Sequence, residues 1–122
     1  MLKIDSEKML IAMTRSDTAT IVFSAEDAEQ NVYVPVAGDV LKFAVAKKVG
    51  AEPLFEVSNT MADDATAFWT IVIEPLKTAG LKFGDYVFDV QLKQASGIVD
   101  TIIGQTDSVS PTFRLWGEIA TE

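Results

Sequence analysis

Hydrophobic and polar residues alternate along much of this chain with the period of two that is typical of β-strands. The clearest example runs from Ala67 to Leu92, where two alternating segments flank a compact corner that ends in Gly-Asp-Tyr. The positions that share an apolar face are Ala67, Trp69, Ile71 and Ile73 in the first segment, and Tyr86, Phe88, Val90 and Leu92 in the second. This stretch predicts two consecutive antiparallel strands, each with one face in a hydrophobic core.

Similar alternation, bounded by turn residues, predicts strands in the rest of the chain. They are expected at Met9–Thr14, Thr18–Phe23, Asn31–Val36, Val40–Lys47, Leu54–Met61, Ile98–Ile103 and Thr112–Trp116. The polar segment 24–30 is expected to connect two strands or to form one helical turn. About seven to nine short strands, without a long amphipathic helix, favour an all-β fold and an antiparallel immunoglobulin-like β-sandwich; a small barrel is the alternative.

The corner between the two strands, Pro75–Gly84, is followed directly by Asp85 and Tyr86. In immunoglobulin-like sandwiches, a tyrosine at the start of a late strand can return its hydroxyl to the backbone of the preceding corner. Its ring buries apolar area while its one polar atom finds a nearby partner. We therefore expect Gly84 and Tyr86 to form a structural corner; the alternative is a ligand-binding role for the Tyr86 hydroxyl.

Length and composition fit one domain that spans residues 1–122, with residues 1–8 as a candidate flexible N-terminal segment. The chain has 48% hydrophobic residues, which is enough to build a core without disulfides or metal. It contains no cysteine and no histidine. Ser-His-Asp and Cys-His catalysis, thiolate metal sites and imidazole metal sites all require residues that are not present.

The formal net charge is −8, from 18 acidic and 10 basic residues. Nucleic-acid binding depends on lysine and arginine side chains that displace counterions from phosphates, so a nucleic-acid partner is not expected. Apolar runs are only as long as strands, and the first ten residues interrupt theirs with charges. We therefore expect no membrane segment and no signal-peptide core.

Two acidic pairs are the main candidates for site chemistry. Asp63 and Asp64 could bind Ca²⁺ with further oxygen ligands, but no D-x-D-x-D-G loop accompanies them. Asp85 and Asp89 are an even number of positions apart, so they would share a face on a regular strand. Paired-carboxylate hydrolysis needs two acids across a cleft, and the sequence indicates no cleft. We predict no catalytic, cofactor-binding or metal-binding residue and no cofactor.

Some large side chains are expected to face outward. Trp69 shares a face with Ile71 and Ile73 and is predicted to lie in the core, whereas Trp116 falls on the opposite face from Phe113 and Leu115. Exposed aromatics can stack on sugars or anchor protein interfaces. The predicted interface residues are Val72, Val87 and Trp116.

Four segments carry motifs of a known family. They are Met13-Thr14-Arg15-Ser16-Asp17-Thr18, similar to Ile-Thr-Arg-Gly-Asp-Thr; Gly38–Val45, a glycine turn before an alternating strand; Leu81–Leu92, similar to Leu-x-x-Gly-x-Tyr-x-Tyr-Asp-Ile-Gln-Leu; and Val99-Asp100-Thr101, similar to a Val-x-Thr strand. Together they resemble the small immunoglobulin-like domains of tailed-phage virion proteins, including the N-terminal domain of phage baseplate upper proteins. The chain departs from this pattern at Ser16, Phe88 and Val90, and its 104–111 connection is longer than usual, which leaves the pairing of the last strand open.

The resemblance implies a non-enzymatic structural role in a phage or prophage virion, as a baseplate, neck or fibre-associated assembly module. It transfers no catalytic residue to this chain. The implied partners are further copies of the chain, as a homo-oligomer, and other virion proteins, and the implied location is the virion, after production in the host bacterial cytoplasm. The alternative function is a carbohydrate-binding or adhesion module that uses Trp116 to contact a host-surface glycan.

Overall fold

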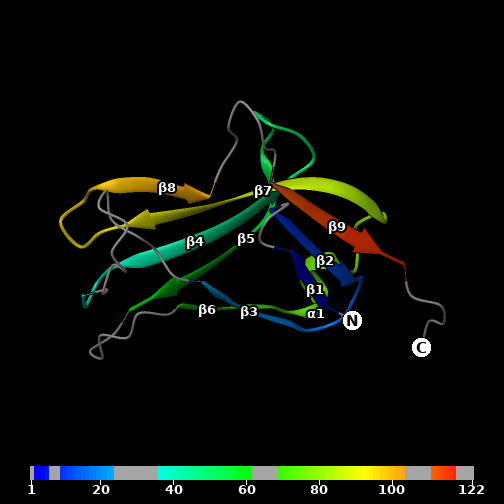
Figure 1. Ribbon diagram of the computed structural model, residues 1–122, viewed down its shortest axis with the longest axis horizontal. Coiled ribbons are helices and arrows are strands. Elements are labelled where there is room, and N and C mark those ends of the chain that lie inside the picture. The colour runs from blue at the N-terminus through cyan, green and yellow to red at the C-terminus, as the bar shows by residue number, and fades with distance from the viewer. Residues whose placement is uncertain (1, 6–8, 24–35, 62–68, 104–110, 118–122) are drawn as a thin grey trace.

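The computed structural model describes residues 2–5, 9–23, 36–61, 69–103 and 111–117, and these form two layers of β-sheet (Figure 1). The strands are β1 (Leu2–Asp5), β2 (Leu10–Thr14), β3 (Ala19–Phe23), β4 (Val40–Ala46), β5 (Pro53–Thr60), β6 (Trp69–Ile73), β7 (Gly84–Lys93), β8 (Val99–Ile103) and β9 (Thr112–Trp116); one short helix, α1, spans Pro75–Thr78. The prediction of an all-β chain is confirmed.

The larger sheet has seven strands in the order β1-β2-β9-β7-β4-β5, with β8 paired to β7 beside this path. Strand β7 pairs with two strands in succession along its length: its first half pairs with β9 and its second half pairs with β8. All pairs are antiparallel except β2 with β9, which run parallel. The prediction of a purely antiparallel fold is wrong at this pair, because strands far apart in sequence meet there and alternation carries no information on strand direction.

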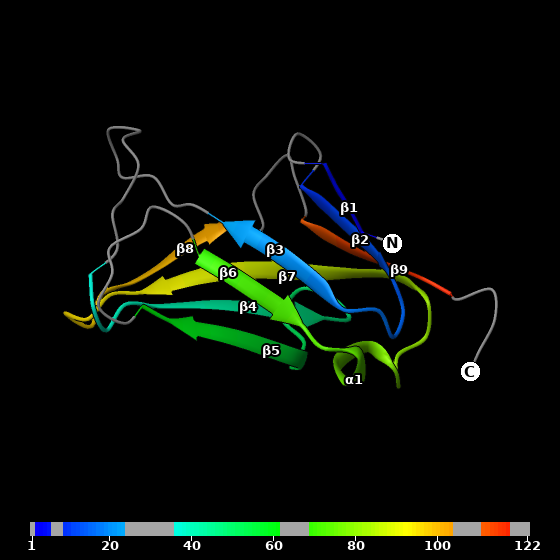
Figure 2. The ribbon, with the colours of Figure 1, turned by 90° about the horizontal axis from the view of Figure 1, so that it is seen from below.

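The smaller sheet consists of β3 and β6, which lie over one side of the large sheet (Figure 2). Their ladder runs from Ala19 opposite Ile73 to Phe23 opposite Trp69. The side-chain amide of Asn59 on β5 donates a hydrogen bond to the Thr70 carbonyl on β6, with an N···O distance of 2.6 Å. The described strands therefore form two sheets joined at this edge, and not the single closed sheet of the barrel alternative.

One hydrophobic core fills the space between the sheets. Its buried members from the large sheet are Ile11, Met13, Leu41, Phe43, Val45, Phe55, Phe88, Val90, Leu92, Phe113 and Leu115, and those from the small sheet are Ala19, Ile21, Phe23, Trp69, Ile71 and Ile73. The alternation predicted these inward positions in both parts of the 67–92 stretch, and Trp69 is a core residue as predicted. Ala67 lies outside the described residues.

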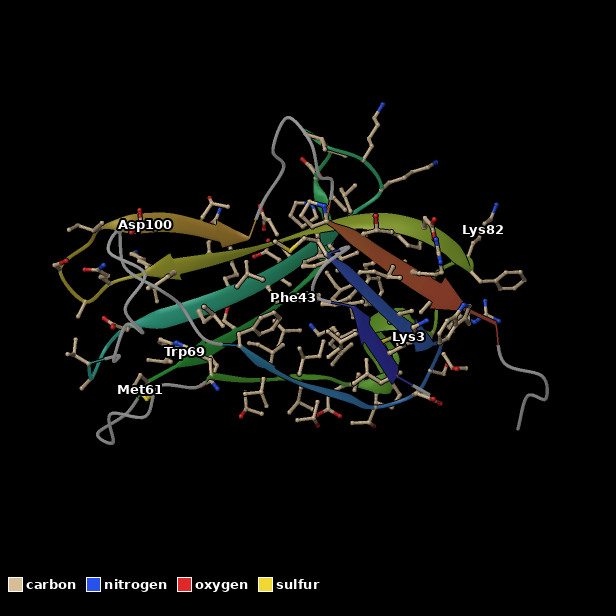
Figure 3. All side chains as sticks on the ribbon, viewed as in Figure 1. Lys3, Phe43, Met61, Trp69, Lys82 and Asp100 are labelled. Carbon is tan, nitrogen blue, oxygen red and sulfur yellow. The ribbon has the colours of Figure 1, made fainter. Side chains whose placement is uncertain are left out.

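Phe43 lies at the centre of this core and contacts aromatic rings from both layers (Figure 3). Its ring centroid is 5.5 Å from Phe88, 6.1 Å from Phe23, 6.2 Å from Phe113 and 6.4 Å from Phe55. These separations and the tilted or edge-on ring angles are the favourable geometry for aromatic pairs. The rings therefore add specific contacts to the burial of apolar area.

Most predicted strand boundaries agree with the structure to within one or two residues. Strand β1, which pairs with β2 through Leu2 and Met13, was not predicted. Helix α1 inside the corner was not predicted either. Residues 24–35, 62–68 and 104–110 lie outside the described part of the chain, so the expected 31–36 strand is described only at Val36, which is exposed and not in a strand.

Candidate functional site

The corner between β6 and β7 is built from one helical turn and a glycine with a positive φ angle. Pro75 begins α1, where its missing N–H costs no hydrogen bond, and the Ala79 N–H donates to the Pro75 carbonyl. The Leu81 N–H then donates to the Thr78 carbonyl, which closes the next turn at 2.9 Å. Gly84 begins β7 with φ at +144°, a conformation that a residue with a Cβ rarely adopts. The glycine thus sets the direction in which β7 leaves the corner.

Tyr86 closes this corner from the strand side. Its hydroxyl donates a hydrogen bond to the Lys82 carbonyl four residues earlier. Its ring is half-buried and packs against the hydrophobic core. The polar atom of Tyr86 is therefore engaged with the backbone of its own corner, in the geometry that the sequence predicted for a structural residue.

The turn between β2 and β3 binds to the same corner. The Ser16 N–H donates to the Thr78 hydroxyl oxygen at 2.9 Å, and Thr78 is completely buried. Arg15 donates from Nη1 to the Leu81 carbonyl at 3.0 Å and from its backbone N–H to the Trp116 carbonyl at 2.8 Å. Sequence reasoning missed Arg15 and Thr78 as linking residues, because each finds its partner more than 60 positions away.

An aromatic ring and a cationic side chain contact each other on the surface, beside the place where the β2–β3 turn meets the corner. The Phe83 ring is 65% exposed, and the guanidinium carbon of Arg15 lies 5.6 Å from its centroid. A Cβ at Gly117 would lie 3.0 Å from the Phe83 ring, so glycine makes room for the ring there. The contact is a cation–π pair at a solvent-exposed site, where such pairs contribute about 0.5–1 kcal/mol.

A buried carboxylate at the start of β4 ties two loops together. Asp39 is fully buried, and its two oxygens accept hydrogen bonds from the N–H groups of Val36, at 3.0 Å, and Ala95, at 2.8 Å. Ala95 belongs to the turn between β7 and β8. Asp39 was missed as a structural residue, because in sequence it is an ordinary acidic residue of a glycine turn.

The three predicted interface residues lie on two different sides of the molecule. Val87 and Trp116 are on the outer face of the large sheet, away from the core, and both are half-buried. Val72 is on the outer face of the small sheet, paired with Thr20. The structure therefore brings Val87 and Trp116 onto one surface and does not bring Val72 to it.

The outer face of the large sheet is apolar across its middle. One row of directly paired residues crosses four strands and consists of Leu10, Thr112, Val87 and Ala46. At one end of this row lies a depression of about 160 Å³ between β4, β7 and the 47–52 turn. Its lining residues are Ala44, Ala46, Lys48, Val49, Gly50, Ala51, Pro53, Val87, Phe88, Asp89 and Pro111. The small alanine side chains of β4 leave this space open. We call the apolar row together with the depression the outer band.

Charged residues border the outer band on both sides. Arg114 donates from Nε and Nη2 to the two carboxylate oxygens of Asp85, at 2.8 and 3.1 Å, and this hydrogen bonding lowers the pKa of Asp85. On the other side, Lys42 forms an ion pair of 3.4 Å with Glu56. Desolvation raises the pKa of Asp89; the Lys42 charge opposes the rise and the Glu56 charge adds to it.

The described charges of this face lie in two separate groups, one on each side of the apolar row. Asp85 and Asp89 share the outer face of β7, as their spacing predicted, but Asp85 is paired with Arg114 and Asp89 borders the depression. Within the described ranges, no group of three or more His, Cys, Asp or Glu side chains is placed to hold a metal ion. Asp63 and Asp64 lie outside those ranges.

No protein-family model matches the chain, and no curated protein matches it in sequence. Among the described residues, no helix has the length and apolar character needed to cross a membrane. The outer face of the large sheet thus presents an apolar band with a shallow depression, bordered by charges of both signs.

The corner hydrogen bond can be tested with Tyr86→Phe, which removes only the hydroxyl. We expect the free energy of unfolding to fall by about 1 kcal/mol, the usual net contribution of one hydrogen bond. Urea denaturation measures the change. Thr20→Val, which removes an exposed hydroxyl from β3, is the control and should change stability by less than about 0.5 kcal/mol. An unchanged midpoint for Tyr86→Phe would mean that this bond does not stabilise the corner.

Asp85→Asn and Asp89→Asn test the opposite pKa shifts on one face of β7. Asp85 has a lowered folded-state pKa, so its ionised form adds stability above the unfolded pKa, and this stability is lost as pH falls through the folded value. Asp89 has a raised pKa, so its favourable contribution is present below the unfolded pKa and is lost as pH rises through the folded value.

We therefore expect Asp85→Asn to lower the urea midpoint at pH 7 and Asp89→Asn to raise it. Both differences should shrink as the pH is lowered toward about 3, because the unfolded carboxyl titrates near 3.9. Urea denaturation at a series of pH values measures both effects, and each variant is the control for the other. Midpoint changes of the same sign at pH 7 would contradict the assigned environments.

Proposed function

We propose that this chain is an immunoglobulin-like β-sandwich that acts as a non-enzymatic structural module in a tailed-phage particle. The proposal combines a strand arrangement, a corner and a contact surface. The family resemblance of the sequence supports it as well.

The strand arrangement supports an immunoglobulin-like fold. In such domains strands C, F and G form one sheet, strands B and E lie in the other, and a variable-type domain adds C′ beside C. Here β9, β7 and β4 are adjacent in the order of G, F and C, with β5 in the place of C′. Strands β3 and β6 pair in the places of B and E. Chain order and sheet order agree for all these strands.

The observation that carries the proposal is the corner at Leu81–Leu92. A tyrosine corner belongs at the start of strand F, and Tyr86 occupies that place on β7 with its hydroxyl bonded to the corner backbone. The same segment carries the strongest part of the resemblance to phage virion domains. Its sequence motif and its structural role therefore support the same family.

The surface supports an assembly role within that family. The polar groups described around the corner and the turns are engaged in holding the fold, as with Thr78, Asp39 and Tyr86. The outer band presents an apolar depression bordered by Lys48 and Asp89. A surface of this kind suits contact with another protein, since apolar contact residues rimmed by polar groups are the usual composition of an interface.

Mass spectrometry of purified phage particles tests this function. If the chain is a virion component, particles from the strain that encodes it should contain it in a constant ratio to the major capsid protein, and a high-salt wash should not remove it. Genes for tail or capsid components should flank its gene. Particles that lack the chain, together with metabolic genes as neighbours, would contradict the virion role and favour the carbohydrate-binding alternative.

A further inference from the structure

We propose that the outer band is the surface through which two copies of this chain associate face to face. This inference rests on the proposed assembly role and specifies which surface performs it. The occupant that we assign to the depression is an apolar side chain from the second copy. Three observations support this assignment: the composition of the band, the balance of charge around it, and the shape of the 47–52 turn.

The composition of the band suits burial against a protein. Leu10, Val87 and Ala46 lie in one row across the sheet, and the row ends in the depression of about 160 Å³. That volume is of the order of one large apolar side chain, far below the 300–1,000 Å³ of typical small-molecule pockets. The depression is therefore sized for a side chain of a partner and not for a cofactor or a drug-sized ligand.

The charges around the band favour a second copy as the partner. The full chain has a net charge of −8, so two copies repel each other wherever acidic surfaces meet. On β2, β9, β7, β4 and β5, however, the charged side chains that face outward are evenly balanced. They are Lys42, Lys93 and Arg114, and Glu56, Asp85 and Asp89. Lys48, which lines the depression, adds one further positive charge, so the described part of this face has no excess of negative charge and a second copy can approach it without acidic repulsion.

Balanced charges also make the face complementary to itself. In a two-fold dimer the same patch meets its own image, so each copy must offer both partners of every contact. The outer band does so, because basic and acidic side chains border the apolar row on the same surface. Arg114 and Asp85 lie on one side of the row, and Lys42, Glu56 and Asp89 lie on the other.

The 47–52 turn supplies a protruding apolar residue. Val49 borders the depression and is 62% exposed. Gly50, with φ at +85°, allows the tight turn that presents it. On the opposite side of the molecule, Val22 on the outer face of β3 has a similar exposure of 58% and belongs to the other layer. These two valines therefore make a matched pair that differs in the face on which each lies.

Sedimentation equilibrium of the purified full chain, up to about 1 mM, tests the proposal. We expect the wild type to dimerise reversibly, and Val87→Arg and Val49→Arg each to raise the dimer dissociation constant at least about tenfold, as for a central contact residue. Val22→Arg is the control and should leave the constant unchanged. Arginine lowers the net negative charge of each copy, so a rise in long-range repulsion between the net charges cannot explain weaker association. Val49 is in an exposed turn, so its variant stays informative if Val87→Arg does not fold.

Each outcome decides the proposal. A wild type that stays monomeric at all concentrations overturns it, including the case in which a different virion protein binds the outer band. A dimer that only Val22→Arg weakens, or that neither outer-band variant weakens, also overturns it. The dimer experiment and the particle experiment can fail separately. If the chain dimerises with the expected pattern but is missing from phage particles, this inference stands and the virion role is refuted. If the chain is present in particles but stays monomeric, the virion role stands and this inference is refuted.

Discussion

The fold depends on burial of one face of the large sheet by a much smaller sheet. The inner face of the seven-stranded layer is rich in Phe, Leu, Ile and Val side chains, and β3 and β6 are the two strands packed over it in the described structure. A two-stranded ribbon is marginal by itself in water. The contact between the Phe23 and Phe43 rings and the burial of Trp69 in the same core therefore stabilise both layers at once, and neither layer has its core without the other.

Polar links then fix how the two layers meet. At one end, Thr78 and Arg15 hold the β2–β3 turn against the corner that connects β6 to β7. At the other end, Asp39 holds the β7–β8 turn to the start of β4. With the inner face and these ends engaged in the fold, the outer face of the large sheet is left as a broad surface with apolar residues. The proposed contact with another protein is assigned to this surface for that reason.

Alternation was enough to predict the strands around Phe43, Trp69 and Phe88 and the faces that they bury, because that signal is local and has a fixed period. Gly84 and Tyr86 were identifiable because the corner that they form is local: the Tyr86 hydroxyl bonds to the Lys82 carbonyl only four residues earlier. The parallel pairing of β2 with β9 and the bonds of Arg15, Thr78 and Asp39 were not predicted, because each joins segments distant in sequence. Val72 was grouped with Val87 because alternation shows only which side chains of a strand share a face. It does not show which of the two sheets the strand belongs to.

Native-state hydrogen exchange measures most directly whether the two layers depend on each other. The account predicts that the hydrogen-bonded amides of β3 and β6 open with the same free energy as those of β4 and β7, and that added denaturant lowers both together, since the layers share one core. Amides of β3 and β6 that exchange through a separate opening of much lower free energy, while β4 and β7 stay protected, would contradict it.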